Sequence, residues 1–130
     1  MSSLRVLIVD DDEGVLDLFE RAFVREEFTV RATSDSQHAL ALMVSDLPDL
    51  VVLDLMMPWV NGIQVLAAMR QQSTLVAVPV LVVTATATSA FELRDFGPLR
   101  VLRKPVALAR LVKAARAMLA GTHPDSQSEE

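Results

Sequence analysis

The sequence predicts an α/β fold in which one parallel sheet is covered by helices on both faces. Short apolar runs rich in β-branched residues lie at 6–9, 50–53 and 80–83, and none of them alternates with polar residues. Such runs are typical of strands buried on both faces of a parallel sheet. Segments with helical spacing lie between these runs, and short strand–helix–strand connections favour right-handed crossovers and parallel pairing.

Five strand–helix pairs are expected in chain order, with weaker strands at 28–32 and 99–102 at the sheet edges. Five pairs favour a flavodoxin-like (βα)5 three-layer sandwich with strand order 2-1-3-4-5. The stretch 85–90 consists of small and β-branched residues, so the fourth helix should be short or poorly formed. The expected inward faces of the other helices are Val15, Leu18, Phe19 and Ala22; Ala39, Leu40, Leu42 and Met43; Ile63, Leu66, Ala67 and Arg70; and Leu111, Ala115, Met118 and Leu119.

The composition indicates one globular domain, because 52% of the 130 residues are hydrophobic and 22% are charged. We expect the domain to span 1–120, and the polar, acidic residues 121–130 to form a frayed tail. The chain has no cysteine, which excludes a disulfide scaffold and fits a cytoplasmic protein. No signal peptide is expected, and no apolar run approaches the ~20 residues of a membrane-spanning helix.

Charge is unevenly distributed along the chain. The net charge of −5 argues against nucleic acid as a partner. Residues 1–60 hold twelve acids and four bases, whereas residues 91–120 hold seven bases and two acids. Solvated helix faces would explain this pattern. The other interpretation is a protein-docking surface on the basic C-terminal third, and a homodimer through that surface is left open.

Polar residues follow the predicted strands at one edge of the sheet. Asp10 and Asp11 end the first strand, Asp54 the third and Thr84 the fourth, and Lys104 follows the fifth. Two carboxylates ~5 Å apart repel each other by roughly 3 kcal/mol at an effective dielectric constant of ~20, so such a cluster requires a cation or shifted pKa values. All-oxygen ligands favour Mg²⁺ over zinc. A metal, an ammonium group and a hydroxyl around one carboxylate form a pocket for a phosphoryl group, with the carboxylate as nucleophile.

Four motifs, each at a strand end, resemble the receiver domain of two-component response regulators over roughly residues 4–120. They are Leu7-Ile-Val-Asp-Asp-Asp12, Leu53-Asp-Leu-Met-Met-Pro58, Val82-Val-Thr-Ala85 and Arg103-Lys-Pro105. The resemblance implies a bacterial signalling domain that receives a phosphoryl group from a sensor histidine kinase or phosphotransfer protein. Its output would be a protein-binding surface formed by helix four, strand five and helix five, acting on a downstream protein target. It would not be an enzyme beyond its own autophosphorylation and autodephosphorylation.

The resemblance also implies a role for each residue of the acidic site. Asp54 would be the phosphoacceptor, and Asp11 a direct Mg²⁺ ligand, with Asp10 reaching the ion chiefly through water. Asp54 and the backbone carbonyl of Met56 would complete the protein ligands. Thr84 would be the switch hydroxyl, Lys104 would pair with the phosphoryl group, and Lys104-Pro105 would be a cis peptide. Asp12, by contrast, is expected to cap the following helix.

Two features depart from the family pattern. Val101 stands where the family usually carries an aromatic residue whose ring rotates during the switch. This chain therefore lacks the ring to which the switch hydroxyl, here that of Thr84, is usually coupled. Thr84 and Lys104 are 20 positions apart in the sequence, a shorter separation than is usual in the family. Thr86 and Met56 are candidates for setting the phosphoryl lifetime. Trp59 is expected to pack on the third helix or to serve a partner, and His38 and His123 are expected at the surface.

The same residues bear on three other functions. A haloacid-dehalogenase-like phosphatase requires a second aspartate two residues after the nucleophile, where this chain has Met56. A flavodoxin-type FMN site conflicts with three aspartates after the first strand, because they would repel the FMN phosphate. A degenerate receiver that acts as a phosphorylation-independent interaction module stays open, chiefly because of Val101. Whether the domain stands alone or comes from a longer protein also stays open.

Overall fold

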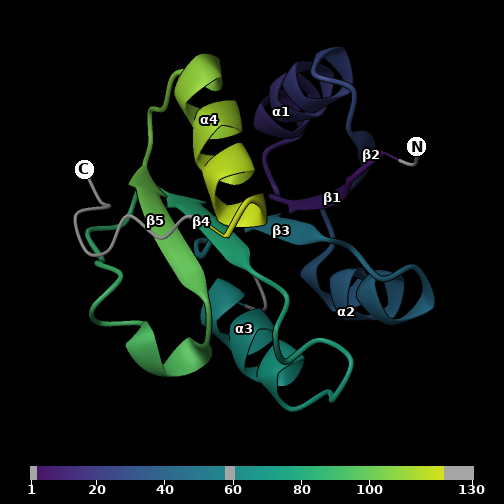
Figure 1. The fold of residues 1–130 in the computed structure, drawn as a ribbon. Coiled ribbons are helices and arrows are strands. Elements are labelled where there is room, and N and C mark those ends of the chain that lie inside the picture. The colour runs from purple at the N-terminus through teal and green to yellow at the C-terminus, as the bar shows by residue number, and fades with distance from the viewer. Residues whose placement is uncertain (1–2, 58–60, 122–130) are drawn as a thin grey trace.

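The computed structural model describes residues 3–57 and 61–121, and shows five parallel strands in the order β2-β1-β3-β4-β5 (Figure 1). The predicted fold class and strand order are therefore confirmed. The elements are β1 (Arg5–Val9), α1 (Glu13–Arg25), β2 (Thr29–Thr33), α2 (Ser36–Ser45), β3 (Leu50–Leu53), α3 (Gly62–Arg70), β4 (Val80–Thr84), the 3₁₀ turn η1 (Arg94–Phe96), β5 (Leu99–Arg103) and α4 (Leu108–Leu119).

The sheet is the middle of three layers. Alternate residues of each strand point to opposite faces, so one strand supplies both halves of the core. Leu7 and Val9 face α2 and α3, whereas Val6 and Ile8 face α1 and α4. Figure 1 shows these two helix pairs on opposite sides of the sheet. Both faces of the central strands are buried, which explains their continuous apolar sequences.

The predicted helices other than the fourth are present, but the expected inward faces of two of them were only partly right, with Phe19 and Leu66 buried as expected. In α1 the buried residues are Leu16, Phe19 and Phe23, and Leu18 is 51% exposed. In α3 the core takes Val65, Leu66 and Met69, while Ile63 is 39% exposed. Both helices carry apolar residues around more of their circumference than one stripe requires. The sequence pattern therefore allowed more than one side of each helix to face the sheet.

The fourth strand–helix pair has no α-helix. Within the described chain, residues 85–93 form turns and bends, and the only helical turn between β4 and β5 is η1. A short or poorly formed helix was expected at 85–90. The structure instead has a single 3₁₀ turn further along the chain, at Arg94–Phe96. The surface expected from helix four, strand five and helix five therefore consists of η1, β5 and α4.

Arg70, expected on the inward face of its helix, joins three segments at the amino-terminal edge of β4 and β5. Its guanidinium donates hydrogen bonds of 2.5 to 3.2 Å to five backbone carbonyls, those of Leu75, Val76, Val78, Phe96 and Pro98. Burial lowers the pKa of this guanidinium. Gly97, which follows η1, has φ +83°, and a Cβ there would lie 2.5 Å from Arg70 Nε. Arg70 thus holds the end of the segment between β4 and β5.

Candidate functional site

The sheet register brings the predicted site residues to one edge. Val9 of β1 pairs with Leu53 of β3, so Asp10 and Asp54 follow neighbouring positions. The ladder continues into the site, because Asp54 donates its N–H to the carbonyl of Val9 at 3.0 Å. On the other side, Lys104 donates its N–H to the carbonyl of Thr84 at 2.9 Å. Backbone hydrogen bonds therefore fix the backbone positions from which these side chains extend into the site.

Three of the predicted carboxylates converge. Asp10, Asp11 and Asp54 each offer an oxygen, and these three oxygens lie within 4.8 Å of one another. Asp10 is 2% exposed and Asp54 is 5% exposed, while Asp11 is open to solvent. An all-carboxylate donor set with one open side fits a hard divalent cation that keeps part of its water shell, as Mg²⁺ does. The residues present therefore fit the expected metal.

Lys104 balances the two buried carboxylates. Its Nζ lies 2.8 Å from Asp10 Oδ2 and 3.3 Å from Asp54 Oδ2. Burial raises the pKa of Asp10 above its ordinary value, although the hydrogen bonds from Lys104 and from the N–H of Asp12 oppose this. Burial alone would lower the pKa of Lys104, but the two carboxylates together raise it. The ammonium is therefore held charged at neutral pH, between the phosphoacceptor candidate and its neighbour.

Thr84 ends β4 beside the site and is fully buried. Its hydroxyl lies 3.0 Å from the hydroxyl of Thr86 and accepts a hydrogen bond from the N–H of Thr86 at 3.3 Å. Of the two candidates for setting the phosphoryl lifetime, Thr86 is thus in contact with the predicted switch hydroxyl. Met56 donates its N–H to Asp54 Oδ1 at 3.1 Å, and its side chain is exposed.

Several smaller expectations are confirmed. Asp12 is the N-cap of α1, and its carboxylate accepts hydrogen bonds from the N–H groups of Gly14 and Val15. The Lys104-Pro105 peptide is cis, and His38 is exposed. The predictions for Trp59 and His123, and for the tail beyond Gly121, lie outside the described residues.

Gly62 is a site residue that the sequence reasoning missed. A Cβ at this position would lie 2.5 Å from the carbonyl oxygen of Asp54 and 2.7 Å from Cα of Leu55. The N–H of Gly62 donates to the carbonyl of Leu55 at 3.0 Å, so α3 starts directly against the strand end that presents Asp54. Asn61 caps this helix in a reciprocal capping box with Gln64. The Asn-Gly pair was a visible signal of the helix start, but the close approach depends on the tertiary structure.

We expect Gly62→Ala to lower the free energy of unfolding by about 1–3 kcal/mol, because the new methyl group overlaps backbone atoms that cannot turn away. Urea denaturation would measure the loss. Gly14→Ala is the matched control, since its Cβ would lie 3.3 Å from the side chain of Asp12, which can shift. Equal stability of the two variants would contradict the close packing of α3 on Asp54.

A family model described as the response regulator receiver domain matches residues 6–116 of the chain. The chain belongs to this family. Among curated proteins, response regulator MprA of Mycolicibacterium vanbaalenii is 38% identical over 129 residues, which are 98% of this chain and 55% of that protein. MprA of Mycobacterium tuberculosis is 36% identical with the same coverage. The chain spans about half the length of the curated relatives that it matches.

Solved structures agree with this assignment. A two-component response regulator of the LuxR family from Aurantimonas superposes with a TM-score of 0.81 at 30% identity, covering 99% of this chain and 90% of that one. The non-phosphorylated HemR receiver domain from Leptospira biflexa gives 0.82 at 27% identity, covering 94% and 98%. The receiver domain is thus a part of two-component signalling. Across the residues that the structure describes, no helix has the length and apolarity to cross a membrane.

Proposed function

We propose that this receiver domain accepts a phosphoryl group on Asp54 from a phosphohistidine of a sensor histidine kinase or phosphotransfer protein in the cytoplasm. The observation that supports the proposal is the position of Asp54, which is buried, next to two further carboxylates and 3.3 Å from the ammonium of Lys104. A carboxylate in this setting is restrained, and its neighbours can compensate the charge of an incoming phosphoryl group.

In the transfer, a carboxylate oxygen of Asp54 attacks phosphorus, an O–P bond forms, and the P–N bond to the donor imidazole breaks. The leaving imidazole nitrogen takes up a proton. The ammonium of Lys104 lies beside the carboxylate of Asp54, so it can pair with that carboxylate before the transfer and with a phosphoryl oxygen after it. The Met56 N–H holds the other oxygen of Asp54 and so orients the nucleophile. The protein contributes position and charge, while the covalent change is confined to Asp54 and the donor.

We propose Mg²⁺ as the cofactor, held directly by Asp11 and Asp54 and through water by Asp10, with the backbone carbonyl of Met56 as a further ligand. A bound Mg²⁺ would neutralise charge on the phosphoryl oxygens. Burial raises the pKa of Asp10, and the nearby carboxylate of Asp54 adds to this, although Lys104 opposes the shift. Lys104 supplies only one unit of positive charge to three carboxylates.

Phosphorylation adds roughly −1.5 to −2 charges at neutral pH, so the hydroxyl of Thr84 would turn from Thr86 toward the phosphoryl group. Val101 is 2% exposed and packs in the core, so it offers no ring that could change from an outer to an inner position. The signal would therefore pass through the backbone after β4 to the η1, β5 and α4 surface. A downstream protein would bind there.

We expect Asp11→Asn to weaken Mg²⁺ binding at least about tenfold, or about 1.4 kcal/mol. Asp12→Asn removes the same charge one residue away but retains a capping side chain, so its affinity should stay within about threefold. Titration calorimetry gives the affinities, and phosphoryl incorporation from acetyl phosphate, with and without chelator, gives the activity. Equal losses in the two variants would show that the metal ligands are wrongly assigned. Absence of incorporation in the native protein with Mg²⁺ would favour the phosphorylation-independent interaction module.

A further inference from the structure

Two threonine hydroxyls meet at the carboxyl end of β4, and one of them is the candidate switch hydroxyl. Thr84 Oγ1 lies 3.0 Å from Thr86 Oγ1 and accepts a hydrogen bond from the N–H of Thr86 at 3.3 Å. Within the described chain, both hydrogen bonds of the Thr84 hydroxyl therefore join it to Thr86. Because Thr84 is 0% exposed, bulk water cannot replace Thr86 as the partner of this hydroxyl.

The backbone of Thr84 is fixed by the sheet, so its hydroxyl can move only by rotation of the side chain. Thr84 pairs with Arg103 in the ladder between β4 and β5, and its carbonyl accepts the N–H of Lys104 at 2.9 Å. A β-branched side chain has few staggered positions about χ1. Rotation of Thr84 to another of these positions breaks the contact between the two hydroxyls, whichever of them donates the proton.

We propose that Thr86 is a positioning residue that holds the hydroxyl of Thr84 in its resting position and thereby opposes activation of the switch. This proposal rests on the proposed function, in which Asp54 carries the phosphoryl group. A phosphoryl oxygen and the hydroxyl of Thr86 then compete for the hydroxyl of Thr84. Thr86 is half-buried, so water can reach its hydroxyl after Thr84 has turned, and the change is reversible.

Neighbouring side chains do not duplicate this role of Thr86. Val101 lies opposite Val82 in the sheet and is 2% exposed, and its side chain has no group that could bond a hydroxyl. The hydroxyl of Thr88, two residues beyond Thr86, donates to Glu92 at 3.1 Å. Among the described residues, Thr86 is therefore the one that holds the resting hydroxyl of Thr84 by hydrogen bonds.

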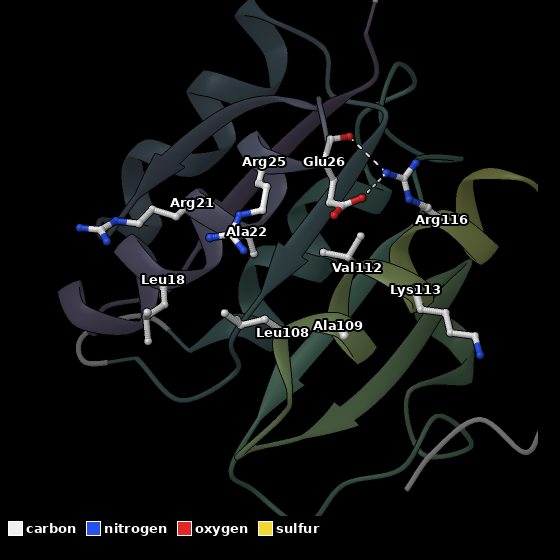
Figure 2. A pocket seen from close by; sticks show the side chains of 10 residues that line it. All are labelled: Leu18, Arg21, Ala22, Arg25, Glu26, Leu108, Ala109, Val112, Lys113 and Arg116. Atoms are coloured by element: carbon white, nitrogen blue, oxygen red, sulfur yellow. Dashed lines mark hydrogen bonds and ion pairs between the residues drawn. The ribbon is translucent and has the colours of Figure 1, made fainter.

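The groove of about 520 Å³ between α1 and α4 provides an internal reference for this local effect (Figure 2). Figure 2 shows Ala22 of α1 and Val112 of α4 among its lining residues. Alternation along β4 places Thr84 on the same face of the sheet as Val82, which packs in the core with α2 and α3. The groove lies on the other face, so a change at Thr86 that acts only on Thr84 should leave it unaltered.

The test measures the affinity of the full chain for beryllofluoride, a phosphoryl analogue, in the presence of Mg²⁺. Thr86→Val keeps the shape of the side chain but removes its hydroxyl, so the resting state loses a hydrogen bond and the affinity should rise about three- to tenfold. Thr86→Ser retains a hydroxyl and should bind within about twofold of the native protein. Thr88→Val is the matched control, because it removes a hydroxyl that bonds Glu92, and it should leave the affinity unchanged.

NMR couplings of Thr84 give a second readout that needs no ligand. Three-bond couplings from its γ-carbon to the backbone nitrogen and carbonyl carbon report the position of the side chain about χ1. We expect one staggered position in the native protein and in Thr86→Ser, and averaging between positions in Thr86→Val. The amide shifts of Ala22 and Val112 should be the same in all three proteins.

The role of Thr86 is overturned if the couplings of Thr84 are the same in Thr86→Val and in the native protein. It is also overturned if Thr88→Val raises the affinity as much as Thr86→Val, if Thr86→Ser behaves like Thr86→Val, or if Ala22 and Val112 shift as much as residues 84–88. Failure of the proposed function gives a different result. A native protein that binds no beryllofluoride would contradict Asp54 as phosphoacceptor and remove the role of Thr86 with it, whereas native binding with no change in Thr86→Val would overturn only the role of Thr86.

Discussion

Asp54→Asn is expected to abolish phosphoryl incorporation from acetyl phosphate, because a neutral amide cannot attack phosphorus as the carboxylate does. The loss should reach the background of the assay, whereas the fold should be retained. Asparagine preserves the shape of the side chain, an oxygen for the Met56 N–H and the backbone N–H that bonds to Val9. Radiolabel incorporation measured together with the thermal midpoint would separate loss of chemistry from loss of structure.

Asp12→Asn is the control for this experiment, because Asp12 belongs to the same acidic run but serves as a helix cap. Its incorporation should remain close to that of the native protein. Labelling of Asp54→Asn at the native level would remove Asp54 as the phosphoacceptor. Labelling that moved to Asp10 or Asp11, identified by mass spectrometry, would show that the carboxylate cluster can take the group at another position.

The second large effect is expected for stability, at Arg70. Arg70→Met retains much of the apolar stem but removes five hydrogen bonds to backbone carbonyls. Hydrogen bonds from a charged donor each contribute more than neutral ones, and carbonyls left without a partner incur a desolvation cost. We expect the free energy of unfolding to fall by about 3–5 kcal/mol, which is large for a single substitution. Urea denaturation with an unchanged m-value would give this difference.

Arg94→Met provides the contrast, because Arg94 is exposed and bonds one carbonyl, that of Phe91. Its guanidinium also lies 4.0 Å from the ring centroid of Phe91, itself a surface residue. The loss there should stay near 0.5–1 kcal/mol, in the range of exposed interactions. If Arg70→Met cost no more than Arg94→Met, the five carbonyls would be satisfied by other donors and Arg70 would not hold this edge.

The sequence by itself determined the fold class, the strand order and the positions of the acidic site. Continuous β-branched runs require burial on both faces, and the residue after each run must lie at the carboxyl edge of the sheet. Asp10, Asp54, Thr84 and Lys104 could be placed together on that ground alone. The cap at Asp12 is also local, because a carboxylate before a helix needs only the N–H groups of the next turn.

Only the tertiary structure decided which faces of α1 and α3 are buried, whereas the expected faces of α2 and α4 agree with the structure. In α1 the apolar residues Val15, Leu16, Leu18 and Phe19 cover much of the helix circumference. The sequence therefore did not show that Leu16, and not Leu18, is buried against the sheet. The bonds of Arg70 to Phe96 and the contact of Gly62 with Asp54 likewise have no local pattern. The physical reason is the same in each case: strand burial and helix capping are set by neighbouring residues, whereas the packing of one surface on another depends on segments distant in the chain.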